Sequence, residues 1–203
     1  MIKKKYSIKN SAKREKSNHK IGLFVGTERG YESLKAISKH KVKISNVLIL
    51  KQQKHEIRNF TEKIAQLCKT HHIPFNFSTD ITPSQYKEYL LRYKPDALFL
   101  VAWRFILPNN CLNIPKRGIF VLHDTLLPKY RGMATTTWPI INGEKETVLC
   151  LIYADDKIDA GDIVDQIRIP INQEDTGRTM NEKYLKLIPE IILKNLDAIL
   201  AGT

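Results

Sequence analysis

The sequence is poor in cysteine and has no long hydrophobic run. Its three cysteines, Cys68, Cys111 and Cys150, are odd in number and lack metal-ligand spacing, which argues against a disulfide scaffold and against a zinc site. No apolar run approaches the ~20 residues that a membrane span needs, and no apolar segment of a secretory signal follows the basic N-terminus. We therefore expect a protein of a reducing, cytoplasmic compartment that holds no metal and does not enter a membrane.

Positive charge is concentrated at the N-terminus. The 203 residues carry a net charge of +12, and residues 1–20, with seven lysines, one arginine and one glutamate, account for +7 of it. Such a segment is too short and polar to pack alone, so we interpret it as a solvated, flexible arm; an arm that contacts nucleic acid or another polyanion is the alternative. The remaining residues, 21–203, are enough for one domain with a real core, and we expect no second domain.

Short apolar runs alternate with segments of helical periodicity along most of the chain. Seven runs predict strands, at residues 21–26, 44–50, 74–77, 96–103, 118–123, 147–153 and 162–169. Helices are predicted at residues 31–37, 58–72, 82–94, 135–141 and from 176 to the end. Near-continuous apolar strands joined by helices predict an α/β protein: a mostly parallel sheet of about seven strands, covered by helices on both faces, with a long C-terminal helix.

The carboxyl ends of the predicted strands are where such a sheet binds ligands. Those ends here are Gly26–Thr27, Trp103–Arg104 and His123–Asp124. Of the six histidines, only His123 stands at the end of a predicted buried strand, and the loop after it lacks core periodicity. His123 is therefore a candidate catalytic residue, and a satisfied structural histidine is the alternative.

Two further segments carry weaker signals. Residues 25–30, VGTERG, form a tight strand-to-helix turn that either holds a phosphate beside Arg29 or is an ordinary turn, since it has neither a Walker ending nor GxGxxG spacing. Residues 155–162 contain four carboxylates without the spacing of an EF-hand. They form either a polar hairpin or an acid placed opposite a histidine.

A longer pattern around His123 is more specific. Residues 123–132, HDTLLPKYRG, resemble the His-x-Ser-Leu-Leu-Pro-x-Tyr-Arg-Gly segment of formyltransferases that use 10-formyltetrahydrofolate. Residues 158–163, IDAGDI, resemble that family's Asp-Thr-Gly-Asp turn, and Asp159 follows His123 by the family's 36 residues. Residues 94–108 and 21–27 resemble its folate-holding strand and loop and its opening strand. The resemblance covers roughly residues 20 to 172 and implies a Rossmann-like formyltransferase fold.

The resemblance implies His123 and Asp159 as catalytic residues but leaves one family position unmatched. The family's catalytic Asn, two residues before the His, is Val121 here, and Thr125 replaces the family's Ser. The resemblance implies that the folate is held by the following residues: Trp103, Arg104, Phe105, Ile106, Leu107, Asp155, Asp156 and Ile158. It implies that the acceptor is held by the following residues: Gly26, Thr27, Thr125, Lys129, Tyr130, Arg131 and Gly132.

The implied reaction moves a formyl group from N10-formyltetrahydrofolate to a primary amine, with no metal. His123 is the implied proton mediator, because a histidine ring takes up and releases protons near neutral pH, and Asp159 would orient it. Valine has no side-chain donor for the oxyanion that forms during the transfer. Either a protonated His123, a backbone N–H or the Thr125 hydroxyl replaces the family's Asn, or the enzyme is slow.

The resemblance leaves open which amine accepts the formyl group. A UDP- or dTDP-linked amino sugar is our leading interpretation, because the Trp-Arg loop and the Lys-Tyr-Arg-Gly segment are shared with sugar N-formyltransferases. Methionyl-tRNA and glycinamide ribonucleotide are the alternative amines, and a nucleic-acid-binding module on a weakened enzyme scaffold is the alternative class. No nucleic-acid motif supports that class, and the sequence leaves a homodimer open.

Overall fold

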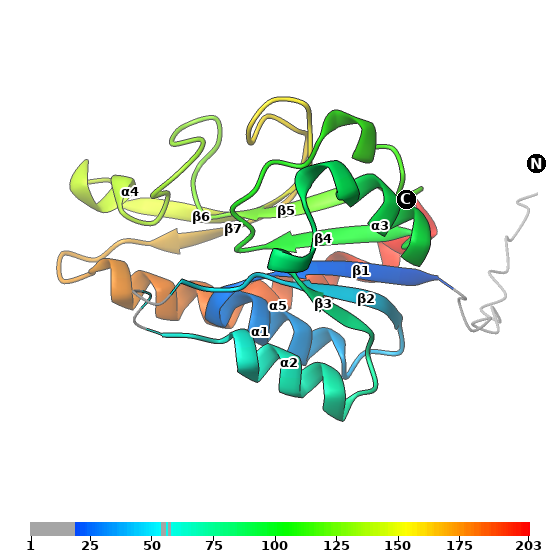
Figure 1. Cartoon of the computed structure of the whole chain (residues 1–203). Helices are drawn as coiled ribbons and strands as arrows, with labels where there is room; N and C mark the ends of the chain where they lie inside the picture. Colours follow the sequence, from blue (N-terminus) through cyan, green and yellow to red (C-terminus); the bar gives the residue numbers. More distant parts are fainter. Residues whose placement is uncertain (1–18, 54–55, 57) are drawn as a thin grey trace, which may run out of the picture.

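A seven-stranded sheet forms the centre of the molecule (Figure 1). The computed structural model describes residues 19–53, 56 and 58–203. The strand order is β3-β2-β1-β4-β5-β6-β7. The strands are β1 (Lys20–Val25), β2 (Lys43–Ile49), β3 (Phe75–Phe77), β4 (Ala97–Val101), β5 (Ile119–His123), β6 (Glu146–Tyr153) and β7 (Ile163–Pro170). All seven strands that the apolar runs predicted are present.

The sheet is parallel from β3 to β5 and antiparallel beyond it. β1 pairs in parallel with β2 and β4, β2 with β3, and β4 with β5, whereas β6 and β7 pair in antiparallel fashion. All five residues of β4 are buried, as expected of a central parallel strand that is covered on both faces. The carboxyl ends of β1, β4 and β5 consequently meet at one edge of the sheet, on the left in Figure 1.

Helices cover both faces of this sheet (Figure 1). The α1 (Thr27–Ile37), α2 (Thr61–Thr70) and α5 (Gly177–Ala201) helices pack on one face, and α3 (Tyr86–Tyr93) packs on the other. The short α4 helix spans Trp138–Ile141, and single 3-10 turns lie at Ser78–Asp80, Pro83–Gln85 and Asn109–Cys111. The α1 helix begins four residues before its predicted start because its first turn, Thr27–Gly30, faces the ligand edge of the sheet and shows no core periodicity.

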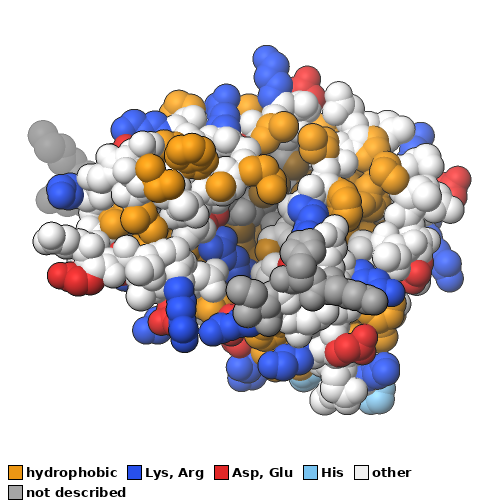
Figure 2. Space-filling model, turned by 60° about the vertical axis from the view of Figure 1, so that its left-hand side comes forward, with side chains coloured by type: hydrophobic (Ala, Val, Ile, Leu, Met, Phe, Trp, Pro, Cys, Tyr) orange, Lys and Arg blue, Asp and Glu red, His pale blue; other side chains and the backbone are white. Residues whose placement is uncertain are grey.

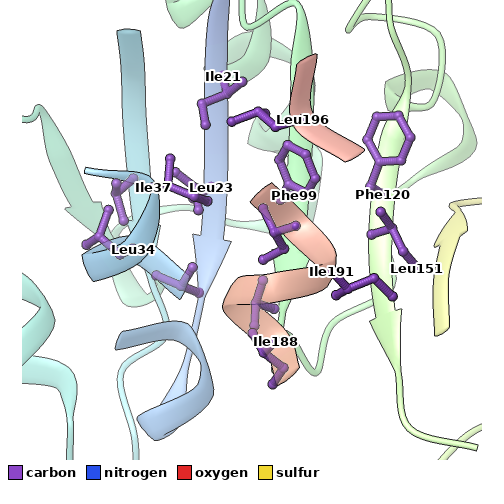
Figure 3. Packing of buried hydrophobic residues seen from close by; sticks show 14 of the residues in the cluster. Ile21, Leu23, Leu34, Ile37, Phe99, Phe120, Leu151, Ile188, Ile191 and Leu196 are labelled. Atoms are coloured by element: carbon purple, nitrogen blue, oxygen red, sulfur yellow. The ribbon is translucent and has the colours of Figure 1, made fainter. Parts of the chain in front are cut away.

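The long α5 helix provides much of the larger core. Its Ile188, Ile191 and Leu196 side chains point toward Phe99 of β4 and Leu151 of β6 (Figure 3). Residues four and three apart lie on one face of a helix, so a single stripe of α5 covers the middle of the sheet. The Thr176 hydroxyl caps the start of the helix, and Gly202 in the left-handed conformation ends it.

Shortening a buried α5 side chain by one methyl group tests this packing. Ile192 has no solvent exposure, so Ile192→Val is expected to lower the free energy of unfolding by about 0.5–1.5 kcal/mol. The same substitution at Ile141, which is 65% exposed, is expected to change it by less than about 0.5 kcal/mol. Urea unfolding of both variants measures the difference, and equal losses would contradict the assigned burial.

The expected basic arm falls mainly outside the described part of the chain. Residues 1–18 are not described, and β1 begins at Lys20, whose backbone N–H donates a hydrogen bond to Asp96. Within the described residues, no helix is both long and apolar enough to cross a bilayer. The same residues contain no group of three or more histidine, cysteine or acidic side chains arranged to hold a metal.

Candidate active site

A cavity lies at the edge where β1, β4 and β5 end. It has a volume of about 270 Å³, and we call it the His123 pocket. Its walls come from the ends of β4 and β5, from the loop after β5 and from the acidic turn, through residues 100–104, 121–124, 132–135 and 159. Figure 2 looks toward this side of the molecule, where the surface is hollowed near its middle, with hydrophobic side chains above the hollow and Lys and Arg side chains below it.

His123 and Asp159 meet inside this pocket, although 36 residues separate them in the sequence. The Nδ1 atom of His123 lies 3.4 Å from Oδ2 of Asp159, and only 6% and 15% of the two side chains are exposed. The Gly132 N–H donates to the same Oδ2 atom at 2.8 Å, which fixes the carboxylate. The other ring nitrogen, Nε2, lies 3.3 Å from the Tyr130 carbonyl oxygen. A ring held between two oxygen acceptors can donate to both when it carries both protons.

Left-handed backbone conformations gather around this pocket. The five non-glycine residues with φ between +48° and +59° that lie at the carboxyl edge are Thr27, Ala102, Tyr130, Ala134 and Asp159. Such conformations cost roughly 1–3 kcal/mol each in residues with a Cβ atom and persist where surrounding structure holds them. Their concentration at this edge supports it as the candidate functional site.

The loop after β5 places the residues expected to bind the acceptor. Thr125 is fully buried, and its hydroxyl donates to the carbonyl oxygens of Lys129 and Tyr130, so it holds the loop and does not reach the pocket. Lys129 and Tyr130 turn outward to Glu144, at 3.0 and 2.8 Å, and Arg131 is exposed. The hydrogen bonds from Tyr130 and Lys129 lower the pKa of Glu144. Only Gly132 of this set lines the His123 pocket.

The residues expected to hold the folate divide into three groups. Trp103 and Arg104 line the His123 pocket, and Arg104 also forms an ion pair with Glu56 at 2.9 Å. The indole N–H of Trp103 is buried and has no hydrogen-bond partner among the described residues. Leu107 is 6% exposed and belongs to the core below the loop. The others stand at the protein surface: Phe105, Ile106, Asp155, Asp156 and Ile158.

Val121 occupies the wall of the pocket where the resemblance implies an Asn. Its side chain packs among the apolar residues below β5 and also lines the pocket. It therefore presents only hydrocarbon toward His123. The polar side chains of the pocket wall are His123, Asp159, Asp124, Thr135, Arg29 and Arg104.

Asp124 forms a buried network that the sequence analysis did not identify. Its carboxylate is 3.1 Å from the Arg29 guanidinium and accepts hydrogen bonds from the hydroxyls of Thr135, at 2.6 Å, and Thr136. Burial raises the pKa of Asp124, but Arg29 and the two hydroxyls outweigh burial and hold it below its usual value. Asp124 is therefore a charged carboxylate beneath the pocket.

A second, larger cavity adjoins the His123 pocket. Its volume is about 890 Å³, and it shares Arg29, Ala102, Ala134 and Thr135 with the smaller pocket. The first turn of α1 faces it without a side-chain cap. Arg58 and Arg178, 54% and 76% exposed, add two cations at its wall, and each is paired with one glutamate, Glu28 or Glu182. Gly26 lies below this wall, where a Cβ atom would clash with Leu50 and Ala102.

Comparison with protein families identifies the class of this domain. The family model described as formyl transferase matches residues 21–196. The chain is 34% identical over 181 residues to the bifunctional polymyxin resistance protein ArnA of Wigglesworthia glossinidia brevipalpis, covering 89% of this chain and 28% of that protein. It is 38% identical over 130 residues to the methionyl-tRNA formyltransferase of Listeria innocua, covering 64% of this chain and 42% of that protein. The chain thus spans less than half the length of these relatives.

Solved structures share the same architecture. A phosphoribosylglycinamide formyltransferase from Anaplasma phagocytophilum superposes with a TM-score of 0.75 at 20% identity, over 90% of this chain and 87% of that one. A sugar 3N-formyl transferase, crystallised in the presence of dTDP and 5-N-formyl-THF, gives a TM-score of 0.70 at 25% identity, over 91% of this chain and 64% of that one. The Rossmann-like fold that the sequence predicted is confirmed.

Proposed function

Because the chain belongs to the formyl transferase family, we propose that it transfers a formyl group from N10-formyltetrahydrofolate to the primary amine of a nucleotide-linked amino sugar. The observation that carries this proposal is the His123–Asp159 pair, 3.4 Å apart in a pocket that opens into a larger cavity. We assign the formyl-bearing end of the donor to the His123 pocket and the acceptor to the larger cavity.

The residues around the His123 pocket suit a folate. The aromatic side chain of Trp103 lines this pocket. Phe105, Ile106 and Ile158 are 46%, 72% and 57% exposed and offer apolar surface to the part of the folate outside the pocket. When bound, the folate supplies the formyl carbon, and its N10 atom is the leaving group.

His123 moves the proton that the transfer requires. The amine must lose a proton to form the new C–N bond, and the departing N10 must gain one as the old bond breaks. His123 accepts the first proton and returns it to N10, so the ring ends the reaction as it began. Asp159, fixed by the Gly132 N–H, holds the ring and stabilises its charged form.

The His123 ring also contributes to stabilising the oxyanion. Val121 cannot donate a hydrogen bond, and the Thr125 hydroxyl is committed to two carbonyl groups. The protonated His123 ring supplies positive charge beside the developing oxyanion, and a backbone N–H, or the Nε2–H once it leaves the Tyr130 carbonyl, serves as the hydrogen-bond donor.

The larger cavity supports an anionic acceptor. The first turn of α1 and the Arg58 and Arg178 guanidinium groups line this cavity, and they suit a diphosphate. We propose that Gly26 and Thr27 shape this end of the cavity, and that Lys129, Tyr130 and Arg131 act at its outer rim.

Removing one of these cations tests the acceptor site. Arg58→Gln and Arg178→Gln are each expected to raise the KM for the nucleotide-linked sugar roughly 3- to 10-fold, with kcat nearly unchanged, because exposed charged hydrogen bonds contribute modestly to binding. Arg92→Gln, at an exposed position of α3, is the matched control and should leave KM unchanged. A fall in kcat without a change in KM would contradict the placement of the acceptor.

The choice of amine is tested by turnover. The purified chain is incubated with 10-formyltetrahydrofolate and, in separate reactions, UDP- and dTDP-linked amino sugars, glycinamide ribonucleotide and methionyl-tRNA, and the release of tetrahydrofolate is followed. Turnover with an amino-sugar nucleotide alone supports the proposal. Turnover with methionyl-tRNA or glycinamide ribonucleotide alone overturns the acceptor, and salt-sensitive RNA binding without folate binding overturns the enzyme.

A further inference from the structure

Asp124 is a buried carboxylate beside the active site that the proposed chemistry does not use. We propose that Asp124, neutralised by Arg29, is a positioning residue that holds the His123–Asp159 pair through the loop of residues 132–136. This inference rests on the proposed function only for the role of His123 and Asp159. The contacts that carry it do not depend on the identity of the acceptor.

Asp124 accepts hydrogen bonds from one end of the loop of residues 132–136. Its Oδ1 atom accepts the Thr135 hydroxyl at 2.6 Å, and its Oδ2 atom accepts the Thr136 hydroxyl. Because Asp124 is 5% exposed and its pKa is lowered, both bonds are charge-assisted and shielded from water. The loop is thereby tied to the residue directly after His123.

Asp159 accepts a hydrogen bond from the other end of this loop. The Gly132 N–H donates to Asp159 Oδ2 at 2.8 Å, and this oxygen is the atom that faces His123. Between the two ends, Gly132 has a φ of +93° and Ala134 a φ of +59°, while Met133 is 80% exposed. A left-handed alanine is unfavourable by itself, so this short segment depends on its two anchors.

Arg29 makes the Asp124 anchor rigid. Its guanidinium donates to Asn181 of α5 at 2.8 Å and to the Thr136 hydroxyl at 3.1 Å, and it lies over the Tyr184 ring at 5.0 Å. The Tyr184 hydroxyl donates to the Asp124 carbonyl oxygen at 2.9 Å. The loop that presents Gly132 to Asp159 is thus connected to α1 and α5.

The test removes the two threonine hydroxyls and keeps the ion pair. In the double variant Thr135→Val/Thr136→Val, side-chain volume and the Arg29–Asp124 contact are retained. We expect exchange of the Gly132 amide proton, followed by NMR on the full chain, to accelerate roughly tenfold, as for the loss of one supporting hydrogen bond. With an active acceptor, kcat is expected to fall about 10- to 100-fold because the ring and carboxylate are misplaced, while the KM for the folate changes little.

Conservative and remote variants separate positioning from general stability. Thr135→Ser/Thr136→Ser retains both hydroxyls and should restore Gly132 protection and kcat. Asp165→Asn, which weakens another carboxylate anchor of α5, to Lys194 and Asn195, should leave Gly132 unaffected. Unchanged Gly132 protection in the valine variant overturns the inference, whether or not kcat falls. If no amine is formylated, the proposed function fails, and the amide measurement still decides this inference.

Discussion

Replacing His123 by alanine is expected to lower kcat for formyl transfer by about 10²- to 10⁴-fold, the contribution typical of a positioned general acid–base group. The reason is the arrangement of the pocket. His123 lies between the Asp159 carboxylate and the Tyr130 carbonyl, and its neighbour on β5 two residues earlier is an apolar valine. Under the proposed mechanism, the variant loses the proton mediator and the positive charge beside the oxyanion.

The measurement is the rate of tetrahydrofolate release at saturating donor and acceptor. His71→Ala, at the exposed end of α2, is the matched control and is expected to retain full turnover. Asp159→Asn should lose less activity than His123→Ala, because an amide still accepts the Gly132 N–H but no longer stabilises a charged ring. Turnover of His123→Ala at the level of the unchanged chain would remove His123 from the mechanism.

The Arg29→Met variant is expected to lose about 3–5 kcal/mol of unfolding free energy at pH 7, because it leaves the Asp124 charge buried without its partner. Methionine keeps much of the side-chain volume, so packing contributes little to the loss. Urea unfolding measures it. Arg168→Met, which breaks the exposed ion pair with Glu146, is the control and should cost no more than about 1 kcal/mol.

The pH dependence of this loss has a defined sign. In the unchanged chain the pKa of Asp124 is lowered, so its stabilising contribution is present above the pKa of the unfolded state and disappears as pH falls through the folded value. Without Arg29, we expect burial to outweigh the remaining hydrogen bonds and to raise the pKa of Asp124, so the variant should be destabilised at neutral pH and less so once the carboxyl is protonated. The gap between the two proteins should therefore narrow as pH falls from 7 toward about 4. A gap that stays constant with pH would show that Asp124 is not its source.

Most strands were predictable because they are short apolar runs bounded by turn residues, although β7 also contains Asp165, Gln166 and Arg168. Residues 97–101, ALFLV, are all apolar and therefore show no helical alternation of apolar and polar residues, and all five are buried in β4. Helix ends were harder to place. The helix predicted for residues 135–141 shrinks to α4 at 138–141, because Thr135 and Thr136 are held by Asp124 in the loop.

The site was only partly predictable from sequence. The strand-end position of His123 and the family-like spacing to Asp159 indicated the pair. The Arg29–Asp124 contact joins residues 95 positions apart, and no periodicity connects them. The helix was predicted to begin at residue 31, so the sequence analysis did not place Arg29 in a helical turn or give it an anionic partner.

The left-handed residues at the carboxyl edge have a consequence for how this protein would tolerate change. Thr27, Ala102, Tyr130, Ala134 and Asp159 hold energetically unfavourable torsions that the rest of the chain enforces. Loosening of the hydrophobic core should therefore disturb these residues at the candidate site before the whole protein unfolds. On heating, formyl-transfer activity should be lost at a lower temperature than most of the secondary structure.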